Sequence, residues 1–433
     1  MDRTEPWQLR AAFARRLSDM YGREVPAYTT LLRVAHEVNQ EVVARDGAAA
    51  ERLGSIARVT AERHGAIRLG TPAELAQVAT VFAAMGMEPV GFYDLREAAS
   101  PVPVVSTAFR PVRADELARN PFRVFTSVLT PGDRRFFTAD LQARLETFLA
   151  GRELFPPALL DLAARAEAES GLSPDDAGRF LDLATAAFEL SPEPVDRAWY
   201  DELGAVSAVA ADIGGVRSTH VNHLTPRVLD IDALYARMTA RGTTMIDDIQ
   251  GPPAWEGPDV LLRQTSFRAL AEPRSFRLPD GSVTTGDLRV RFGEVEARGA
   301  ALTREGRAVY DAAVAEVAAM RLPTAAARQE AAQQVWRRSF PATEEGLFDA
   351  GLAYAEHRVV DGRTVRVPVV YEDFLPQSAA GIFASNLSAD ATTDRSEEGL
   401  GLDAAWLAGA VGREVHDPFD LYAAQAAASP APA

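Results

Sequence analysis

Cysteine is absent from this chain of 433 residues. Its absence excludes disulfides, zinc–thiolate sites, iron–sulfur clusters and thiol nucleophiles, so any metal ion must be bound by histidine, carboxylate or water. Long apolar runs are also missing. No segment approaches the ~18 apolar residues of a membrane span, and the opening MDRTEPWQLR lacks the basic-then-apolar order of a signal peptide. We therefore expect a cytoplasmic protein with no membrane partner.

Basic residues are outnumbered by acidic ones, 45 Lys and Arg against 61 Asp and Glu, which gives a formal net charge of −16. A surface that binds nucleic acid needs clustered basic side chains, and the sequence has no such cluster. We therefore expect no nucleic-acid partner. The hydrophobic content of 47% and the aromatic content of 8% are ordinary for a globular protein with a buried core.

Histidine is scarce, with six residues in the chain, yet two of them occupy equivalent places in a repeated pattern. The first copy has His64 and, four residues later, Arg68; the second has His223 and Arg227. In each copy a short extended run leads into a helical pattern that ends at a glycine, and strand-like segments follow. Such a repeat is typical of similar units that share one core. We expect curved sheets facing a cavity, and we test whether a metal is bound between the units.

The predicted fold class is α+β, with two modules that each run strand, helix and several strands, and with added helices. The predicted ranges are 1–60 for N-terminal helices, 61–137 for the first module, 138–217 for a helical insertion, 218–300 for the second module and 301–433 for a C-terminal helical and lid region. In the second module we predict the strands TTMIDDI, DVLLRQTSFRAL and LRVRFGEVEARG, with a turn at Pro279-Asp280-Gly281. A hairpin is predicted around Asp361-Gly362.

Strand geometry decides which histidine of the second module faces the cavity. Alternate residues of a strand share a face, so His223 and Arg227 point to one side and His220 points to the other. In the first module His64 and Arg68 share a face by the same rule. The parallel between the modules therefore predicts that His223, and not His220, faces inward.

The apolar face of LRVRFGEVEARG continues into Glu294 and Glu296. Burying a carboxylate alone is costly, so a carboxylate at the end of a buried row must be paired or bound to a metal. Two histidines and one carboxylate on converging strands would form the facial triad that suits non-haem Fe(II). Alternatives stay open: each histidine could be structural, Glu294 could pair with an arginine, and Glu296 could be a solvated edge residue or could support a metal ligand. Arg68 and Arg227 could simply pair with acids.

Four separated motifs resemble one known family. HVNHLTPRVLDID, RHGAIRLGTPAEL, FGEVEARG and YEDFLPQSAAGIFASNL are together similar to the 2-oxoadipate dioxygenase/decarboxylases, also called 2-hydroxyglutarate synthases. The resemblance runs across nearly the whole chain. It implies a vicinal-oxygen-chelate core of paired βαβββ modules with Fe(II) as the cofactor. It also implies that the metal ligands are His64, His223 and Glu294.

Further site residues follow from the same resemblance. FGEVEARG is similar to the last-ligand strand of 4-hydroxyphenylpyruvate dioxygenases, where an Arg follows the ligand Glu by four residues, as Arg298 follows Glu294 here. The family uses an Arg four residues after its first His to bind substrate, which implies Arg68, and Arg227 is the counterpart in the second module. Gln377 stands where the family pattern leads us to expect an apolar residue, and whether it alters how the pocket closes stays open at this point.

The resemblance implies that a 2-oxo diacid and O₂ are the partners. Oxidative decarboxylation and hydroxylation of 2-oxoadipate would give 2-hydroxyglutarate and CO₂, a step of lysine catabolism. Two rivals stay open: a lyase or isomerase of the same fold that uses Zn²⁺, Ni²⁺ or Mn²⁺, and a protein that binds small molecules without catalysis. We also predict that the uncharged segment LPQSAAGIFASNL packs over the cavity mouth as a lid.

Overall fold

The computed structural model describes residues 3–98, 100–269, 272–288, 291–360, 362–375 and 399–428. The two helices predicted within residues 5–46 are present as α1 (Pro6–Glu24) and α2 (Pro26–Asp46), and Pro26 begins the second because its fixed φ suits a first helical turn. A 3₁₀ turn, η1 (Gly47–Glu51), and α3 (Ile56–Ala61) lead to the first module. Within the described ranges, no helix has both the length and the apolar character required to cross a membrane.

The first module has the predicted order of strand, helix and three strands. Its main elements are β1 (Arg63–Leu69), α4 (Pro72–Ala83), β2 (Glu88–Asp94), β3 (Val104–Arg110) and β4 (Arg123–Leu129), with η2 (Leu95–Glu97) and α5 (Ala114–Arg119) between them. Thr71 and Glu74 form a capping box that fixes the start of α4 directly after β1. The predicted glycine stop is confirmed, since Gly86 follows α4 with a φ of +67°.

The second module is only partly the predicted copy of the first. Its elements are β6 (His223–Pro226), α11 (Ile231–Ala240), β7 (Leu262–Phe267) and β10 (Gly293–Arg298). The strand predicted for TTMIDDI is wrong, because this segment makes an isolated bridge from Met245 to Phe267 and no continuous ladder. LRVRFGEVEARG is also not one strand. Leu288 ends β9, which belongs to another sheet, and β10 begins at Gly293.

The predicted turn at Pro279-Asp280-Gly281 is confirmed, but it joins two strands that leave the module's own sheet. These are β8 (Glu272–Arg277) and β9 (Val283–Leu288), which pair with each other, while β8 also pairs with β5 (Val195–Asp196) of the helical insertion. Most of β9 is exposed, and only Leu288 is buried. An alternating sequence therefore does not show with which sheet a hairpin pairs.

Strand pairing brings the two modules into direct contact. The larger sheet has the order β2-β3-β4-β1-β6, with β1 parallel to β4 and antiparallel to β6. The series continues to β10, because Arg227 and Glu296 form a parallel bridge and the N–H of Val228 donates to the carbonyl of Glu296 at 2.8 Å. β10 then pairs antiparallel with β7. Strands of both modules therefore lie side by side where the repeat places its histidines.

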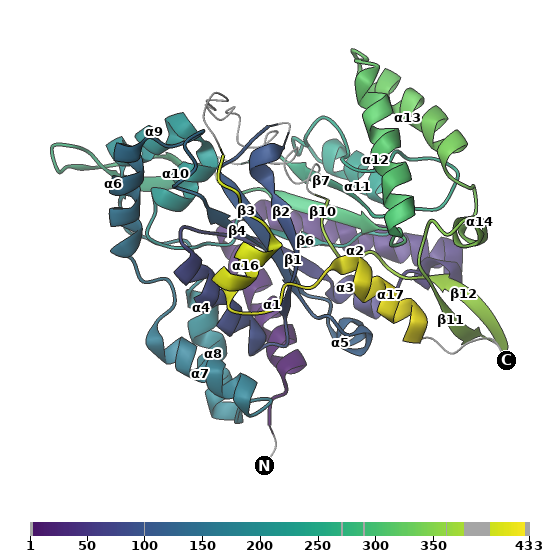
Figure 1. Cartoon of the computed structure of the whole chain (residues 1–433), viewed down its shortest axis with the longest axis horizontal. Helices are drawn as coiled ribbons and strands as arrows, with labels where there is room; N and C mark the ends of the chain where they lie inside the picture. Colours follow the sequence, from purple (N-terminus) through teal and green to yellow (C-terminus); the bar gives the residue numbers. More distant parts are fainter. Residues whose placement is uncertain are drawn as a thin grey trace.

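Helices surround this series of strands. The insertion contains α6 (Ala139–Ala150), α7 (Pro157–Ala168), α8 (Pro174–Ala186), α9 (Arg197–Val206) and α10 (Ala208–Gly214). The C-terminal region contains α12 (Arg304–Ala319), α13 (Ala325–Ser339), α14 (Glu344–Asp349), the predicted hairpin β11 (Ala355–Val360) and β12 (Arg363–Pro368), α16 (Ala404–Val411) and α17 (Pro418–Ala428). In Figure 1, α6, α9 and α10 lie on the left of the strands, and α12 and α13 lie on the right.

Two hydrophobic clusters cover opposite faces of β1. Ile67 and Leu69 belong to the larger cluster, which includes residues of α1, α2 and α4. Ala66 belongs to a second cluster with Phe125 and Phe374. His64 and Arg68 have the same parity as Ala66, so they face the second cluster, and the functional site lies on that side. The predicted lid, residues 375–387 including Gln377, lies outside the described residues except for its first residue.

Candidate metal centre

His64 and His223 are placed by neighbouring strands. His64 is the second residue of β1, where it pairs with Arg123 of β4 and Thr225 of β6. His223 begins β6 directly opposite Ala66. Paired residues project to the same side of a sheet, so both imidazoles leave the sheet on one face, and their ring centroids lie 5.3 Å apart.

Glu294 of β10 completes the group from the second module. Its Oε2 lies 3.0 Å from Nδ1 of His223, and its Oε1 lies 3.7 Å from Nε2 of His64. All three residues are buried, and each offers one ligand atom such that the three atoms lie within 4.8 Å of one another. The structure therefore brings together the three residues that the sequence and the resemblance singled out as a ligand set.

The surroundings of the triad suit a metal cation. Nε2 of His223 is buried and has no hydrogen-bond partner among the described residues, which leaves an acceptor for a further bond. Burial lowers the pKa of His223, although the Glu294 carboxylate opposes the shift, so the ring is held in the neutral form that binds metals. Two imidazoles and one carboxylate are a donor set for a divalent ion. The residues present fit such an ion.

Aromatic rings form the apolar walls of the triad. Phe374 contacts His64 edge to face with a centroid distance of 4.9 Å, and Phe292 contacts His223 in the same way at 5.1 Å. Phe374 also packs on Phe125 of β4 at 5.0 Å. These rings exclude water from two sides, and a lower local dielectric strengthens the interaction between a metal and its ligands.

Glu296 lies next to the triad but is not one of its three residues. It is fully buried, which excludes the solvated edge position that the sequence left open. Its Oε2 lies 2.9 Å from Nδ1 of His64, the nitrogen that faces away from Glu294. Burial alone would raise the pKa of Glu296, but Arg298 and His64 outweigh it and lower the pKa well below its ordinary value. Glu296 is therefore an ionised neighbour of His64.

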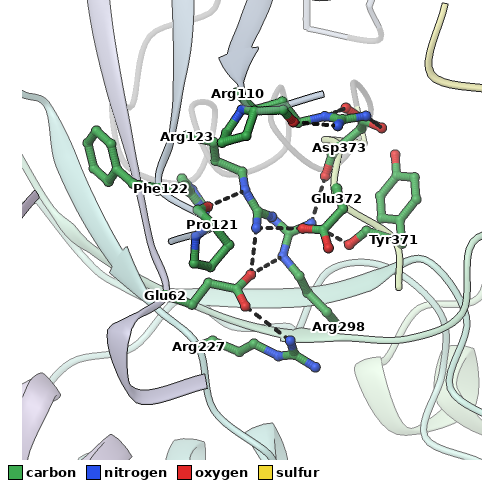
Figure 2. A network of polar contacts seen from close by, with 12 residues as sticks. Glu62, Arg110, Pro121, Phe122, Arg123, Arg227, Arg298, Tyr371, Glu372 and Asp373 are labelled. Carbon is green, nitrogen blue, oxygen red and sulfur yellow. Dashed lines mark hydrogen bonds and ion pairs between the residues drawn. The ribbon is translucent and has the colours of Figure 1, made fainter. Parts of the chain in front are cut away.

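A buried network of charged residues continues from Glu296, as Figure 2 shows in part. Glu62 accepts hydrogen bonds from Arg227 at 3.0 Å and Arg123 at 2.7 Å, and Arg123 also donates to Glu372 at 2.8 Å. Arg298 lies 3.1 Å from Glu62. Burying charges is tolerated only when partners satisfy them, and here each guanidinium contacts one or more carboxylates. The network joins the segment before β1 to the segment after β12.

Arg227, one of the two predicted substrate-binding residues, is part of this network. Its Nη1 donates to Glu62, and its Nη2 donates to the backbone carbonyl of Leu53 at 3.0 Å. Two of its donor groups are thus bound within the protein.

Arg68, the other predicted substrate-binding residue, lies in a separate buried cluster. Its Nη1 pairs with Oδ2 of Asp212, which comes from α10 in the helical insertion. The same carboxylate accepts a hydrogen bond from Asn222 at 2.8 Å and lies 3.1 Å from Nε2 of His220. His220 therefore contacts Asp212 and is not one of the three residues of the triad; it lies before β6, so strand alternation does not set its direction. The positive charge of Arg68 also acts on the triad, because its repulsion contributes to the lowered pKa of His223.

Asp212, Phe374 and the acids of the network were not found from the sequence. Asp212 interrupts the apolar stretch AVSAVAADIGG, and an acid in such a stretch is a signal for a buried partner. Glu62 and Glu372 have no such local signal. A different signal was available for the network, because all 45 basic residues of the chain are arginine. Arginine keeps its charge when buried and can pair with two acids at once, which lysine does poorly.

Comparisons with known proteins identify the family of the chain. A family model described as 2-oxoadipate dioxygenase/decarboxylase matches residues 13–386. A 2-oxoadipate dioxygenase/decarboxylase of Mycobacterium tuberculosis is 61% identical over 424 residues, which cover 98% of each chain. The crystal structure of the hydroxyglutarate synthase from Pseudomonas putida in complex with 2-oxoadipate is similar with a TM-score of 0.85 and 37% identity, over 99% of this chain and 98% of that one.

A more distant structure bears on the fold alone. A putative glyoxalase superfamily protein from Ralstonia eutropha JMP134 is 20% identical, with a TM-score of 0.51 over 68% of this chain and 84% of that one. This likeness agrees with the predicted α+β fold. The match of the family model and the identity to the mycobacterial relative, both over most of the chain, show that the chain belongs to the 2-oxoadipate dioxygenase/decarboxylase family.

Proposed function

We propose that the chain is a non-haem Fe(II) enzyme that converts 2-oxoadipate and O₂ to 2-hydroxyglutarate and CO₂, as a step of lysine catabolism. The observation that carries the proposal is the buried group of His64, His223 and Glu294, which strands of both modules bring within ligand distance of one another. The family to which the chain belongs supports the choice of substrate and reaction.

His64, His223 and Glu294 would hold the metal. A set of two histidines and one carboxylate suits Fe(II) and leaves coordination positions for other ligands, and Fe(II) bound there would supply the redox chemistry that O₂ requires. The chain's own contribution is to hold the imidazole of His223 neutral, to place one carboxylate beside the two imidazoles and to exclude water with Phe374 and Phe292.

Arg68 would bind the carboxylate of the substrate that lies far from the reacting end. It projects from the same face of β1 as His64, four residues further on, and four strand residues span ~13 Å. A six-carbon diacid can bridge much of this distance, and the remaining part is within reach of a long side chain. Asp212 holds the guanidinium from α10, so the helical insertion supports the orientation of Arg68. An arginine is suited to this role because it can bind a carboxylate through two N–H groups.

Arg227 is the second candidate for the distal carboxylate. Its position in the repeat is equivalent to that of Arg68, but Glu62 and the carbonyl of Leu53 already accept hydrogen bonds from it. Arg68 lies on the same face of β1 as His64, and this placement favours Arg68.

Oxygen uptake with a panel of 2-oxo acids tests the proposed function. The protein is purified anaerobically, loaded with Fe(II), and mixed with 2-oxo diacids of four to seven carbons and with matched 2-oxo monoacids. We expect rapid uptake with 2-oxoadipate, one CO₂ released per O₂ consumed, and 2-hydroxyglutarate as the product. Turnover without O₂ would favour the rival lyase or isomerase. Binding of 2-oxoadipate that survives chelation of all metal, without turnover, would favour a binding protein.

A further inference from the structure

The two ring nitrogens of His64 face two different carboxylates. Nε2 points toward Glu294 at 3.7 Å, and Nδ1 lies 2.9 Å from Oε2 of Glu296. The two glutamates occupy alternate positions of β10, so both project from the same face of that strand. One strand therefore supplies a carboxylate to each side of the same imidazole.

This arrangement distinguishes the nitrogens of His64 chemically. A carboxylate beside Nδ1 favours the tautomer that carries its proton on Nδ1, and this leaves the lone pair of Nε2 directed toward Glu294. The acid beside Nδ1 of His223 is a different kind of neighbour, because this nitrogen lies 3.0 Å from Oε2 of Glu294, which is itself a member of the triad. Of the two histidines in the triad, His64 is the one whose Nδ1 contacts an acid that is not itself one of the three residues.

Glu296 is itself held firmly. Arg298 donates two hydrogen bonds to Glu296, from Nε to Oε1 at 2.7 Å and from Nη2 to Oε2 at 3.0 Å. Arg298 is in turn fixed by the backbone, because its Nη1 donates to the carbonyls of Tyr371 at 2.8 Å and Asp373 at 3.1 Å. Figure 2 shows Arg298 at the centre of the network between Glu62 and Tyr371. A carboxylate with both oxygens engaged cannot turn away from His64 without breaking these contacts.

The segment that anchors Arg298 also contacts His64 directly. Phe374 follows Asp373 and places its ring against the imidazole of His64. His64 is thus bounded by Glu296 on the side of Nδ1 and by Phe374 against its ring. The position of Glu296 depends on Arg298 and, through it, on the backbone carbonyls of Tyr371 and Asp373. The histidine is fixed both by an ion contact and by packing.

We propose that Glu296 is a positioning residue for the metal centre, which sets the tautomer and orientation of His64 and thereby raises the affinity of the triad for a divalent ion. The inference rests on the proposed function in requiring that the triad binds a metal. It assigns no contact between Glu296 and the metal or the substrate. Carboxylates that support a metal-bound histidine typically contribute a factor of about 10–100 in metal affinity.

Glu296→Gln and a matched control, Glu372→Gln, test the proposal. Both wild-type residues are buried glutamates in the same arginine network, and each substitution removes one negative charge at nearly constant volume. Glu372 contacts Arg58 and Arg123 but not the triad. Affinity for Co(II) and Fe(II) is measured anaerobically by competition with a chelator. We expect Glu296→Gln to weaken metal binding about 10–100-fold and Glu372→Gln to leave it within about threefold.

Two further measurements distinguish a loss of folding from the proposed loss of metal affinity through His64. ¹⁵N-histidine NMR of the Zn(II)-loaded protein should show His64 with its proton on Nδ1 in the wild type, and a changed signal in Glu296→Gln only. If Glu296→Gln does not fold, the double variant Glu296→Gln/Arg298→Gln restores the charge balance and should still bind metal weakly. Wild-type affinity in a folded Glu296 variant, or equal loss in both glutamine variants, would overturn the inference. If the wild type binds no ion, or His64→Ala binds as tightly as the wild type, the proposed function itself fails.

Discussion

Replacing Glu372 by Gln measures how strongly the buried arginine network stabilises the fold. Glu372 lies in the segment after β12 and pairs with Arg58 and Arg123, which come from the other end of the chain. Burial would raise the pKa of Glu372, but Arg58, Arg123 and Arg298 outweigh it and lower the pKa from an ordinary 4.5 to about 2. The carboxylate is therefore ionised at neutral pH, and its charge stabilises the folded state.

The direction and the size of the change in stability with pH follow from the difference between the pKa of Glu372 in the folded and in the unfolded state. A carboxyl group whose pKa is lower in the folded state contributes stability above its unfolded pKa and loses that contribution as the pH falls toward its folded pKa. A pKa lowered from 4.5 to about 2 corresponds to roughly 3 kcal/mol in total. Of this, about 1 kcal/mol is lost by pH 4, and the rest is lost as the pH falls toward 2. At pH 7, Glu372→Gln should cost roughly 3–5 kcal/mol, because it leaves buried arginines short of a partner.

Urea unfolding of the wild type and of Glu372→Gln at pH 7, 6, 5 and 4 checks these values. The wild-type free energy of unfolding should exceed that of the variant by several kcal/mol at pH 7. The difference should be constant down to about pH 5.5 and then shrink by about 1 kcal/mol at pH 4, since only the wild type has this carboxylate to protonate. A difference that stays constant or grows toward pH 4 would refute the assignment of Glu372 as an ionised partner of the network.

Further predictions concern the site. His223→Ala should abolish iron binding and His220→Ala should keep measurable iron; metal analysis that gives the reverse would show that His220 is the ligand. Arg68→Ala should raise KM for 2-oxoadipate roughly thirtyfold or more, with unchanged iron content and a much smaller effect on a 2-oxo monoacid; equal losses for both substrates would make Arg227 the better candidate. Asp212→Ala should lower the free energy of unfolding by roughly 3–5 kcal/mol, because it leaves Arg68 buried without this partner, and Asp212→Ala/Arg68→Ala should recover part of that loss in a double-mutant cycle.

Local periodicity was sufficient to place the metal-ligating candidates on strands. His64 and His223 share a position in a repeat, and this shared position favoured His223 over His220, which is not one of the three residues of the triad. His220 lies before β6, so strand alternation could not predict its direction. Parity could not choose between Glu294 and Glu296, because both lie on the same face of β10. The resemblance selected Glu294, and the structure places it beside both histidines while Glu296 contacts the far nitrogen of His64.

Contacts between distant segments could not be predicted in the same way. The pairing of Arg227 with Glu62 joins residues 165 positions apart, and Arg68 meets Asp212 across 144 positions. The periodicity of hydrophobic residues indicates which face of a helix or strand is buried, but it does not indicate which other element covers that face. For the same reason LRVRFGEVEARG was wrongly predicted to form one strand. Its sequence alternates continuously, but the segment includes parts of two strands, β9 and β10, that belong to different sheets.

In the motif FGEVEARG, the glycine before Glu294 affects where that glutamate lies. Gly293 begins β10 directly before Glu294, and it pairs with Phe267 of β7. A Cβ atom on Gly293 would lie 1.9 Å from Cε1 of Phe267, far inside van der Waals contact. Phe267 is buried in the core, so its ring has little room to move. The glycine is required here for close approach, because no side chain fits between the two strands.

Gly293→Ala should therefore push β10 away from β7 and displace Glu294 with it. Overpacking of this kind costs roughly 1–3 kcal/mol, and metal sites tolerate shifts of only about 0.2 Å in ligand distance. We expect lower stability and clearly weaker metal binding, measured by urea unfolding and by chelator competition. Phe267→Leu in the Gly293→Ala background removes the clashing ring atoms and should restore most of the metal affinity, whereas Phe267→Leu alone should cost stability but little affinity. If the second substitution restores nothing, the steric account is wrong, and Gly293 is needed for the backbone conformation that presents Glu294.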